Sequence, residues 1–262
     1  MTSQAARPVS LTRVMPRIQL VGSSHAMRRV HREAVLAARL NASVLISGER
    51  GVGKTSIARF IHEHSDRSAN GFAVLHCEGL PDLLVESELF GHVRGSFAGA
   101  YRDKPGLLES VRGGTLFLDE VGTLSPRMQA RLLRFLATGE YLGIGGDNVR
   151  VQASLNVRLI ASTSANLPAL VDAGLFLDDL HDRLNAVSLW VPPLRERRDD
   201  IPSLVDHFIG QFAGRGTTVE ADGPDESPEI STEVYAALCQ AEWPGNVQEL
   251  RSVVLRQLLS AH

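Results

Sequence analysis

One short segment of the sequence has the residue types needed to hold phosphate groups. Residues 48–55 read Gly-Glu-Arg-Gly-Val-Gly-Lys-Thr and fit the pattern G-x-x-x-x-G-K-[ST] completely. Glycines in such a turn let backbone N–H groups point at phosphate oxygens, and the start of a following helix favours an anion. The motif predicts a nucleotide site with Lys54 on the outer phosphates and the Thr55 hydroxyl on Mg²⁺. The predicted contacts are Gly48, Glu49, Arg50, Gly51, Val52, Gly53, Lys54 and Thr55.

Two adjacent carboxylates mark a second candidate element. The apolar run 115–118 ends in Asp119 and Glu120. Such a pair, at the carboxyl end of a strand, faces the ligand crevice of an α/β sheet. We predict that Asp119 supports Mg²⁺ and that Glu120 polarises the attacking water. Acidic strand ends are common, so this interpretation depends on the pairing with residues 48–55.

The remaining pattern predicts the fold that positions these motifs. Short apolar runs, typical of buried strands, lie at residues 43–47, 72–77, 115–118, 157–162 and 187–191. Helical patterns separate them, notably at 126–138 and 167–184. Strands alternating with helices favour an α/β domain with a mainly parallel sheet. The glycine-rich motif follows the first of these strands and precedes a helix, as phosphate binding requires.

The pattern along the chain predicts three parts. Residues 1–19 read as a leader, and residues 20–198 as an α/β nucleotide-binding part. Residues 199–262 show helical segments, so we predict a helical lid there, with a loop at the polar insert 214–229. The last helical pattern covers residues 247–259. No basic helix of the kind that recognises DNA is evident, so we expect no DNA-binding domain in this chain.

Composition excludes several other classes. The 262 residues are 44% hydrophobic, which suits a packed core, and the net charge of −3 excludes a polybasic chain that coats nucleic acid. Only two of the 27 basic residues, Lys54 and Lys104, are lysines. Two cysteines, Cys77 and Cys239, cannot form a disulfide framework. No apolar run approaches the roughly 20 residues that span a bilayer. We therefore expect a cytoplasmic protein without a membrane partner.

Four further blocks give the sequence a specific resemblance. It resembles the AAA+ domain of bacterial enhancer-binding proteins, the P-loop ATPases that activate transcription by the sigma-54 form of RNA polymerase. The resemblance runs from about Leu20 to Leu259. Besides the two motifs above, it is carried by residues 20–24 (LVGSS), 86–92 (ESELFGH), 192–197 (PPLRER) and 243–251 (WPGNVQELR).

The resemblance implies an assembly and roles for further residues. The protein should form a ring, a hexamer, with ATP and Mg²⁺ bound between subunits. Val21 and Gly22 should lie against the adenine, and Gln248 of the lid near the phosphates. Thr163 belongs to the sensor strand, and Arg183 should act on a neighbouring subunit's nucleotide, with a structural ion pair as its alternative role. ATP hydrolysis should move a surface loop, residues 95–100, that grips sigma-54.

This sequence departs from the family pattern at five positions. The loop that grips sigma-54 reads Gly95, Ser96, Phe97, Ala98, Gly99, Ala100, so alanine replaces the family's threonine and its hydroxyl. Leu177 replaces the first of two interface arginines. The other departures are His76 and Ser164, each in place of asparagine, and Gln248 in place of arginine. These changes affect hydrolysis and the contact with sigma-54, whereas the phosphate-binding motif is intact.

Two functional hypotheses follow. The first is an ATPase that remodels the closed promoter complex of sigma-54 RNA polymerase. The second is a regulatory subunit that binds nucleotide, hydrolyses it poorly and assembles with related subunits in a mixed ring, or acts on another polymerase form. We expect the chain to bind ATP and to hydrolyse it weakly, which is compatible with both hypotheses.

Overall fold

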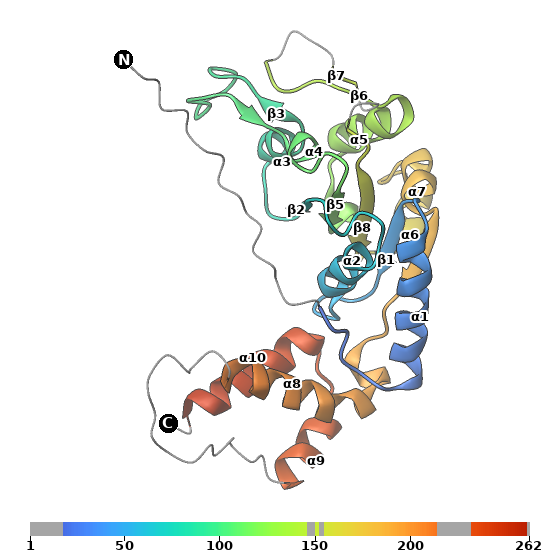
Figure 1. Ribbon diagram of the computed structural model, residues 1–262, viewed down its shortest axis with the longest axis vertical. Helices are drawn as coiled ribbons and strands as arrows, with labels where there is room; N and C mark the ends of the chain where they lie inside the picture. Colours follow the sequence, from blue (N-terminus) through green and yellow to red (C-terminus); the bar gives the residue numbers. More distant parts are fainter. Residues whose placement is uncertain (1–17, 146–149, 152–154, 214–231, 261–262) are drawn as a thin grey trace.

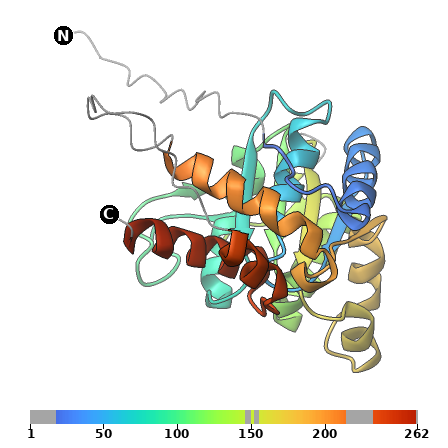
Figure 2. The same ribbon diagram turned by 90° about the horizontal axis from the view of Figure 1, so that it is seen from below.

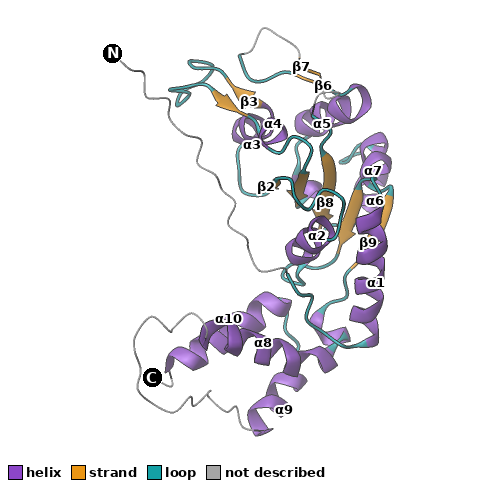
Figure 3. Cartoon of the chain, in the orientation of Figure 1, coloured by secondary structure: helices purple, strands orange, loops and turns teal. Residues whose placement is uncertain are grey.

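The computed structural model describes residues 18–145, 150–151, 155–213 and 232–260. The expected leader, apart from Ile18 and Gln19, and the expected loop at 214–229 lie outside these residues. Figure 1 shows an α/β body with a group of helices at one end, and Figure 3 gives the same view by secondary structure.

A five-stranded parallel sheet forms the centre of the body. Its order is β2-β5-β8-β1-β9, and every neighbouring pair is parallel. The strands are β1 (Val44–Ser47), β2 (Phe72–His76), β5 (Thr115–Asp119), β8 (Arg158–Thr163) and β9 (Val187–Trp190). All five predicted strands are therefore present, with ends that differ by one residue at most. Because the strands are parallel, their carboxyl ends share one edge, where the phosphate loop and the carboxylate pair meet.

Helices cover both faces of the sheet. On one face α1 (His25–Arg39) and α2 (Lys54–Glu63) pack on alternate strand residues such as Ile46, Phe117 and Ile160. On the other face the intervening residues, such as Leu116 and Leu118, pack against a second set of helices. That set comprises α3 (Asp82–Phe90), α4 (Leu107–Ser110), α5 (Pro126–Thr138), α6 (Leu167–Asp172) and α7 (Asp178–Leu184), and the 3-10 turn η1 (Val121–Thr123) precedes α5.

The segment predicted as one helix over residues 167–184 is two helices. Gly174, with φ +68°, lies between α6 and α7 in the left-handed region that ends helices. The sequence prediction was wrong here because the apolar spacing continues across the break. Two short antiparallel hairpins also lie outside the main sheet, β3 (Gly91–His92) with β4 (Lys104–Pro105), and β6 (Glu140–Tyr141) with β7 (Arg150–Val151).

The carboxyl-terminal helices form a lid with its own core. Trp243 and Leu250 pack there against Val205 and Leu194. The elements are η3 (Leu194–Glu196), η4 (Arg198–Asp200), α8 (Ile201–Ala213), α9 (Thr232–Gln240) and α10 (Asn246–Ser260). Figure 2, seen from below, shows α8 and α10 lying side by side across the end of the body. Among the helices of the described residues, none is both long and apolar enough to cross a membrane.

Candidate nucleotide site

The phosphate loop links β1 to α2 and leaves the start of that helix open. Gly53, with φ +106°, precedes α2, and no side chain in the described part of the chain caps the first N–H groups of the helix. These groups and the positive end of the helix dipole are therefore available to an anion. Lys54 is buried, with 6% of its side chain exposed, so its ammonium group is held at the loop.

The two predicted carboxylates lie at the end of β5, next to β8. Ser162 donates a hydrogen bond from its hydroxyl to Asp119 Oδ1 at 2.5 Å. His76 Nδ1 lies 3.0 Å from the other oxygen of Asp119. The resemblance implies that the residue at 76 restrains the catalytic glutamate, but here His76 contacts Asp119 instead. Glu120 follows with φ +60°, a strained conformation for a residue with a side chain, which turns it out of the strand.

Lys54 and Glu120 form the central ion pair of the site. Lys54 Nζ lies 2.8 Å from Glu120 Oε1 and also donates to the carbonyl oxygens of Gly48 and Glu49, at 2.8 and 3.2 Å. The other Glu120 oxygen accepts hydrogen bonds from the N–H and the hydroxyl of Ser164. Burial opposes ionisation of Glu120, but these bonds outweigh it and hold the pKa of Glu120 below its usual range. The site therefore contains an ionised carboxylate beside a buried ammonium group.

A cavity of about 860 Å³ joins the phosphate loop, the carboxylates and the lid. Its wall is rich in basic side chains, which favours a polyanionic ligand. The lining residues include Arg50, Gly51, Gly53, Lys54, Thr55, Arg59, Asp119, Glu120, Val247, Gln248 and Arg251. Thr55 and Asp119 line the same cavity and offer a hydroxyl and a carboxylate oxygen, the hard ligands that Mg²⁺ prefers. The donor set thus fits a Mg²⁺–nucleotide complex.

Three predicted site residues lie elsewhere. Thr163 directs its hydroxyl to Ala165, so Ser162 and Ser164, not Thr163, contact the carboxylates. Val21 packs against the lid core. A Cβ on Gly22 would come within 2.9 Å of the carboxyl group of Asp200. Neither Val21 nor Gly22 lines the cavity in the described part of the chain, so their contact with adenine stays a prediction.

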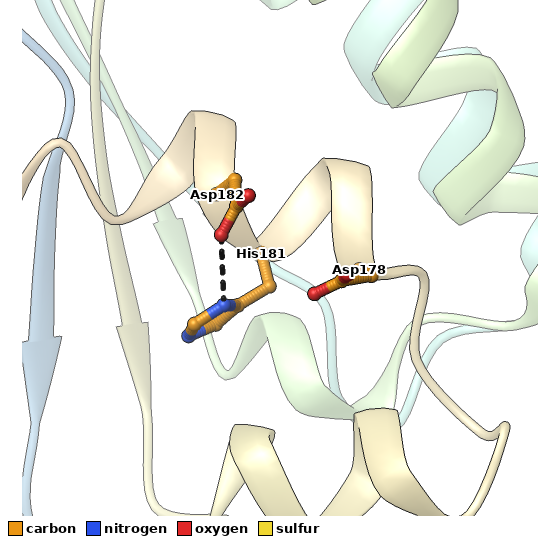
Figure 4. A group of neighbouring side chains, drawn as sticks. All are labelled: Asp178, His181 and Asp182. Atoms are coloured by element: carbon orange, nitrogen blue, oxygen red, sulfur yellow. Dashed lines mark ion pairs between the residues drawn. The ribbon is translucent and has the colours of Figure 1, made fainter.

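Arg183 lies on α7, away from its own chain's cavity. Its guanidinium donates to the carbonyl oxygen of Leu136 at 3.4 Å and lines no part of the wall described above. Leu177, which replaces an arginine, precedes α7 and is 37% exposed. Figure 4 shows Asp178, His181 and Asp182 grouped on this helix, with His181 Nδ1 3.6 Å from Asp182 Oδ1. Arg183 thus contributes nothing to the wall of that cavity, and its action on a neighbouring subunit stays a prediction.

The loop of residues 95–100 projects from the hairpin of β3 and β4, on the side of the body away from the lid (Figure 1). Phe97 packs edge-on against His92 at the hairpin, with ring centroids 5.0 Å apart. Ala98 and Gly99 are exposed at the tip. Lys104, the second lysine, forms an ion pair with Glu88 of α3 at 2.6 Å and so fastens the base of the loop.

Helices α3 and α5 connect this loop to the carboxylate pair. Ser125, which caps α5 just after Glu120, donates to Asp82 of α3 at 2.5 Å. Further along, Arg127 and Arg131 of α5 both pair with Glu86 of α3, which is only 2% exposed. The hairpin that carries the loop follows α3 directly.

Comparison with known proteins identifies the family of this chain. The family model described as Sigma-54 interaction domain matches residues 20–190. The chain belongs to this family. A model described as AAA+ ATPase lid domain matches residues 195–262. The motif blocks of the sequence predict this family, and the prediction is confirmed.

Individual relatives of the sigma-54 interaction domain family show the same pattern. The chain is 43% identical to the DNA-binding transcriptional regulator NtrC of Escherichia coli K12, over 90% of this chain and 48% of that protein. It is 42% identical to the Nif-specific regulatory protein of Azotobacter vinelandii, over 92% of this chain and 44% of that protein. The chain thus spans about half the length of these relatives.

Solved structures confirm the AAA+ fold. NtrX from Brucella abortus, crystallised with ATP, matches with a TM-score of 0.81 and 34% identity, over 93% of this chain and 53% of that one. Its complex with ADP matches with a TM-score of 0.82 and 33% identity, over 94% of this chain and 52% of that one.

Proposed function

We propose that the chain binds Mg²⁺–ATP and regulates transcription by sigma-54 RNA polymerase as a cytoplasmic subunit of an AAA+ ring, with slow intrinsic hydrolysis. The observation that carries the proposal is the pairing of Lys54 with Glu120 in the wall of a cavity that the phosphate loop also lines. Relatives whose structures hold ATP and ADP support nucleotide binding. Lys54 would neutralise the outer phosphates, while Thr55 and Asp119 would hold Mg²⁺.

Two features support slow hydrolysis: the contacts of the Glu120 carboxylate and the loss of an arginine on the surface expected to face a neighbouring subunit. Both oxygens of Glu120 are engaged, one by Lys54 and one by Ser164. Leu177 provides no cation where the family has its first interface arginine, and Arg183 alone remains. Loss of one such cation can lower the rate by about 10³-fold.

A second candidate function is that of a nucleotide-binding partner in a mixed ring. It is favoured by the acidic surface of α7 and by Ala98, which offers no hydroxyl at the exposed tip of the loop. In such a ring, related subunits would supply the missing arginine and the contact with sigma-54.

The experiment combines nucleotide titration, phosphate release and capture of sigma-54. The purified chain should bind ATP with Mg²⁺ and release phosphate slowly when alone. Ala98→Thr should increase capture of sigma-54 in the presence of a non-hydrolysable ATP analogue, while the matched variant Ser96→Thr should not. Failure to bind ATP would refute both candidate functions. Stimulation of phosphate release only by a related subunit would favour the mixed ring.

A further inference from the structure

The carbonyl oxygens of the phosphate loop are all held by hydrogen bonds. Lys54 Nζ donates to the oxygens of residues 48 and 49, as described above. The next three oxygens accept bonds from residues of the lid. These bonds are Asn246 Nδ2 to Arg50 O at 2.9 Å, Gln248 N–H to Gly51 O at 3.2 Å, and Arg197 Nη2 to Val52 O at 2.8 Å.

The direction of these carbonyl groups fixes the direction of the N–H groups that follow. In a planar trans peptide the C=O of one residue and the N–H of the next point in opposite directions. The chain has no cis peptide among its described residues. The N–H groups of Gly51, Val52 and Gly53 therefore point away from the three donors. Successive N–H groups that point to the same side form the concavity that binds phosphate.

Asn246 makes the bond that depends most on its side chain. It is completely buried, and its backbone has φ +53°, which asparagine tolerates better than most residues. Its Oδ1 accepts from the N–H of Leu194 at 2.8 Å. Its Nδ2 donates to Arg50 O and also to Glu49 Oε2, at 2.9 and 3.2 Å. One amide group thus joins η3 and α10 of the lid to the phosphate loop.

The backbones of the loop and the lid are also in direct contact. A Cβ on Gly51, which has φ +77°, would lie 2.3 Å from the carbonyl oxygen of Gly245. No side chain fits between these two segments. A shift of the lid backbone at residues 245–248 therefore displaces the phosphate loop directly.

We propose that Asn246 is a positioning residue through which the lid holds the phosphate loop in its anion-binding conformation. The inference rests on the proposed nucleotide binding, and it adds a residue that does not itself line the cavity. The lid then orders the N–H groups of the phosphate loop already in the free chain. This preorganisation raises the affinity for nucleotide.

Asn246→Asp tests this positioning role with an isosteric change. Aspartate retains the acceptor for the Leu194 N–H but places an anionic oxygen against Arg50 O and the carboxylate of Glu49. Affinity for a fluorescent ATP analogue with Mg²⁺ should fall by about tenfold or more, since a buried acceptor loses its donor. Hydrogen exchange of a peptide covering residues 246–250, whose Gln248 N–H donates to Gly51 O, should quicken, while exchange in the sheet stays unchanged.

Asn70→Asp is the matched control. The Asn70 side-chain amide likewise donates to a carbonyl oxygen, that of Gly113 at 3.1 Å, but at the opposite edge of the sheet. Its affinity for the analogue should equal that of the wild type. If Asn246→Asp does not fold, Arg197→Met replaces it: this change removes the bond to Val52 O and should weaken binding in the same direction.

The outcomes separate this inference from the proposed function. Wild-type affinity and wild-type exchange of residues 246–250 in a folded variant would overturn the positioning role. A wild-type chain that binds no ATP would overturn the proposed function instead. The exchange measurement still decides the positioning role in that case, because it requires no nucleotide.

Discussion

Ser164 donates two hydrogen bonds to a single carboxylate oxygen of Glu120, one from its backbone N–H and one from its hydroxyl, both at 2.8 Å. The other oxygen of Glu120 lies 2.8 Å from Lys54 Nζ. In the free chain the carboxylate is therefore occupied on both sides. A phosphate group must compete with Glu120 for Lys54, and a water molecule must compete with Ser164 for Glu120.

Glu120→Gln should separate binding from hydrolysis. A neutral amide no longer forms an ion pair with Lys54, so ATP affinity should equal or exceed that of the wild type. Phosphate release should fall by about 10²-fold or more, because the group that polarises water is lost. Nucleotide titration and single-turnover phosphate release measure the two effects. Glu88→Gln, which alters the ion pair with Lys104 outside the cavity, is the control. A tenfold loss of affinity in Glu120→Gln would contradict this account.

Leu177→Arg should raise the rate of hydrolysis. The substitution restores a cation at a 37% exposed position before α7 and leaves intact the bond from the Leu177 N–H to Gln129 Oε1. We expect an increase of about tenfold or more at protein concentrations where subunits associate, and none where they are dispersed. Phosphate release measured against protein concentration tests this, with Leu177→Gln as the uncharged control. An equal gain in both variants would show that charge is not the cause.

Glu49→Gln should reduce the acid sensitivity of the fold. Hydrogen bonds from Arg195 and Asn246 lower the pKa of Glu49 from 4.5 to about 2. A lowered pKa means that the ion pair contributes its full stability above about pH 4.5 and loses it as the pH falls towards 2. The difference in unfolding free energy between the wild type and Glu49→Gln should therefore shrink across this window. Urea unfolding at several pH values measures it.

Arg195→Gln provides the cross-check for that experiment. Arg195 donates to both oxygens of Glu49, at 2.8 and 2.5 Å, so removing it should flatten the same pH window. The pair is partly exposed, and the total effect should be small at high salt. If the pH dependence of the unfolding free energy is the same in both variants as in the wild type, other titratable groups cause it.

Local pattern was sufficient to predict the elements that carry the site. Short apolar runs ending in functional residues, such as the strand before Asp119, predicted all five strands of the sheet. The break at Gly174 was missed because the apolar period on either side is the same. The order of the strands depends on contacts between distant segments, and no local pattern encodes it.

The same distinction applies to the site. The phosphate-binding motif could be read directly, because its residues are consecutive. The contacts that shape it could not, since Ser162 reaches Asp119 over 43 residues and Asn246 reaches Arg50 over 196. Thr163 was predicted from the resemblance. Successive side chains of a strand point to opposite faces, so Ser162 meets Asp119 in its place, and Ser164, just after the strand, meets Glu120.

The contacts between α3 and α5 have a mechanical consequence. Asp82 joins the cap of α5 and, one helical turn further along, Glu86 joins two of its arginines. A single contact would act as a pivot, but two separated contacts fix the angle between the helices as well as their distance. A rotation of α5 that begins at the carboxylate pair would therefore turn α3 as well. The exposed tip at Ala98 and Gly99, at the far end of the hairpin, would then move further than either helix.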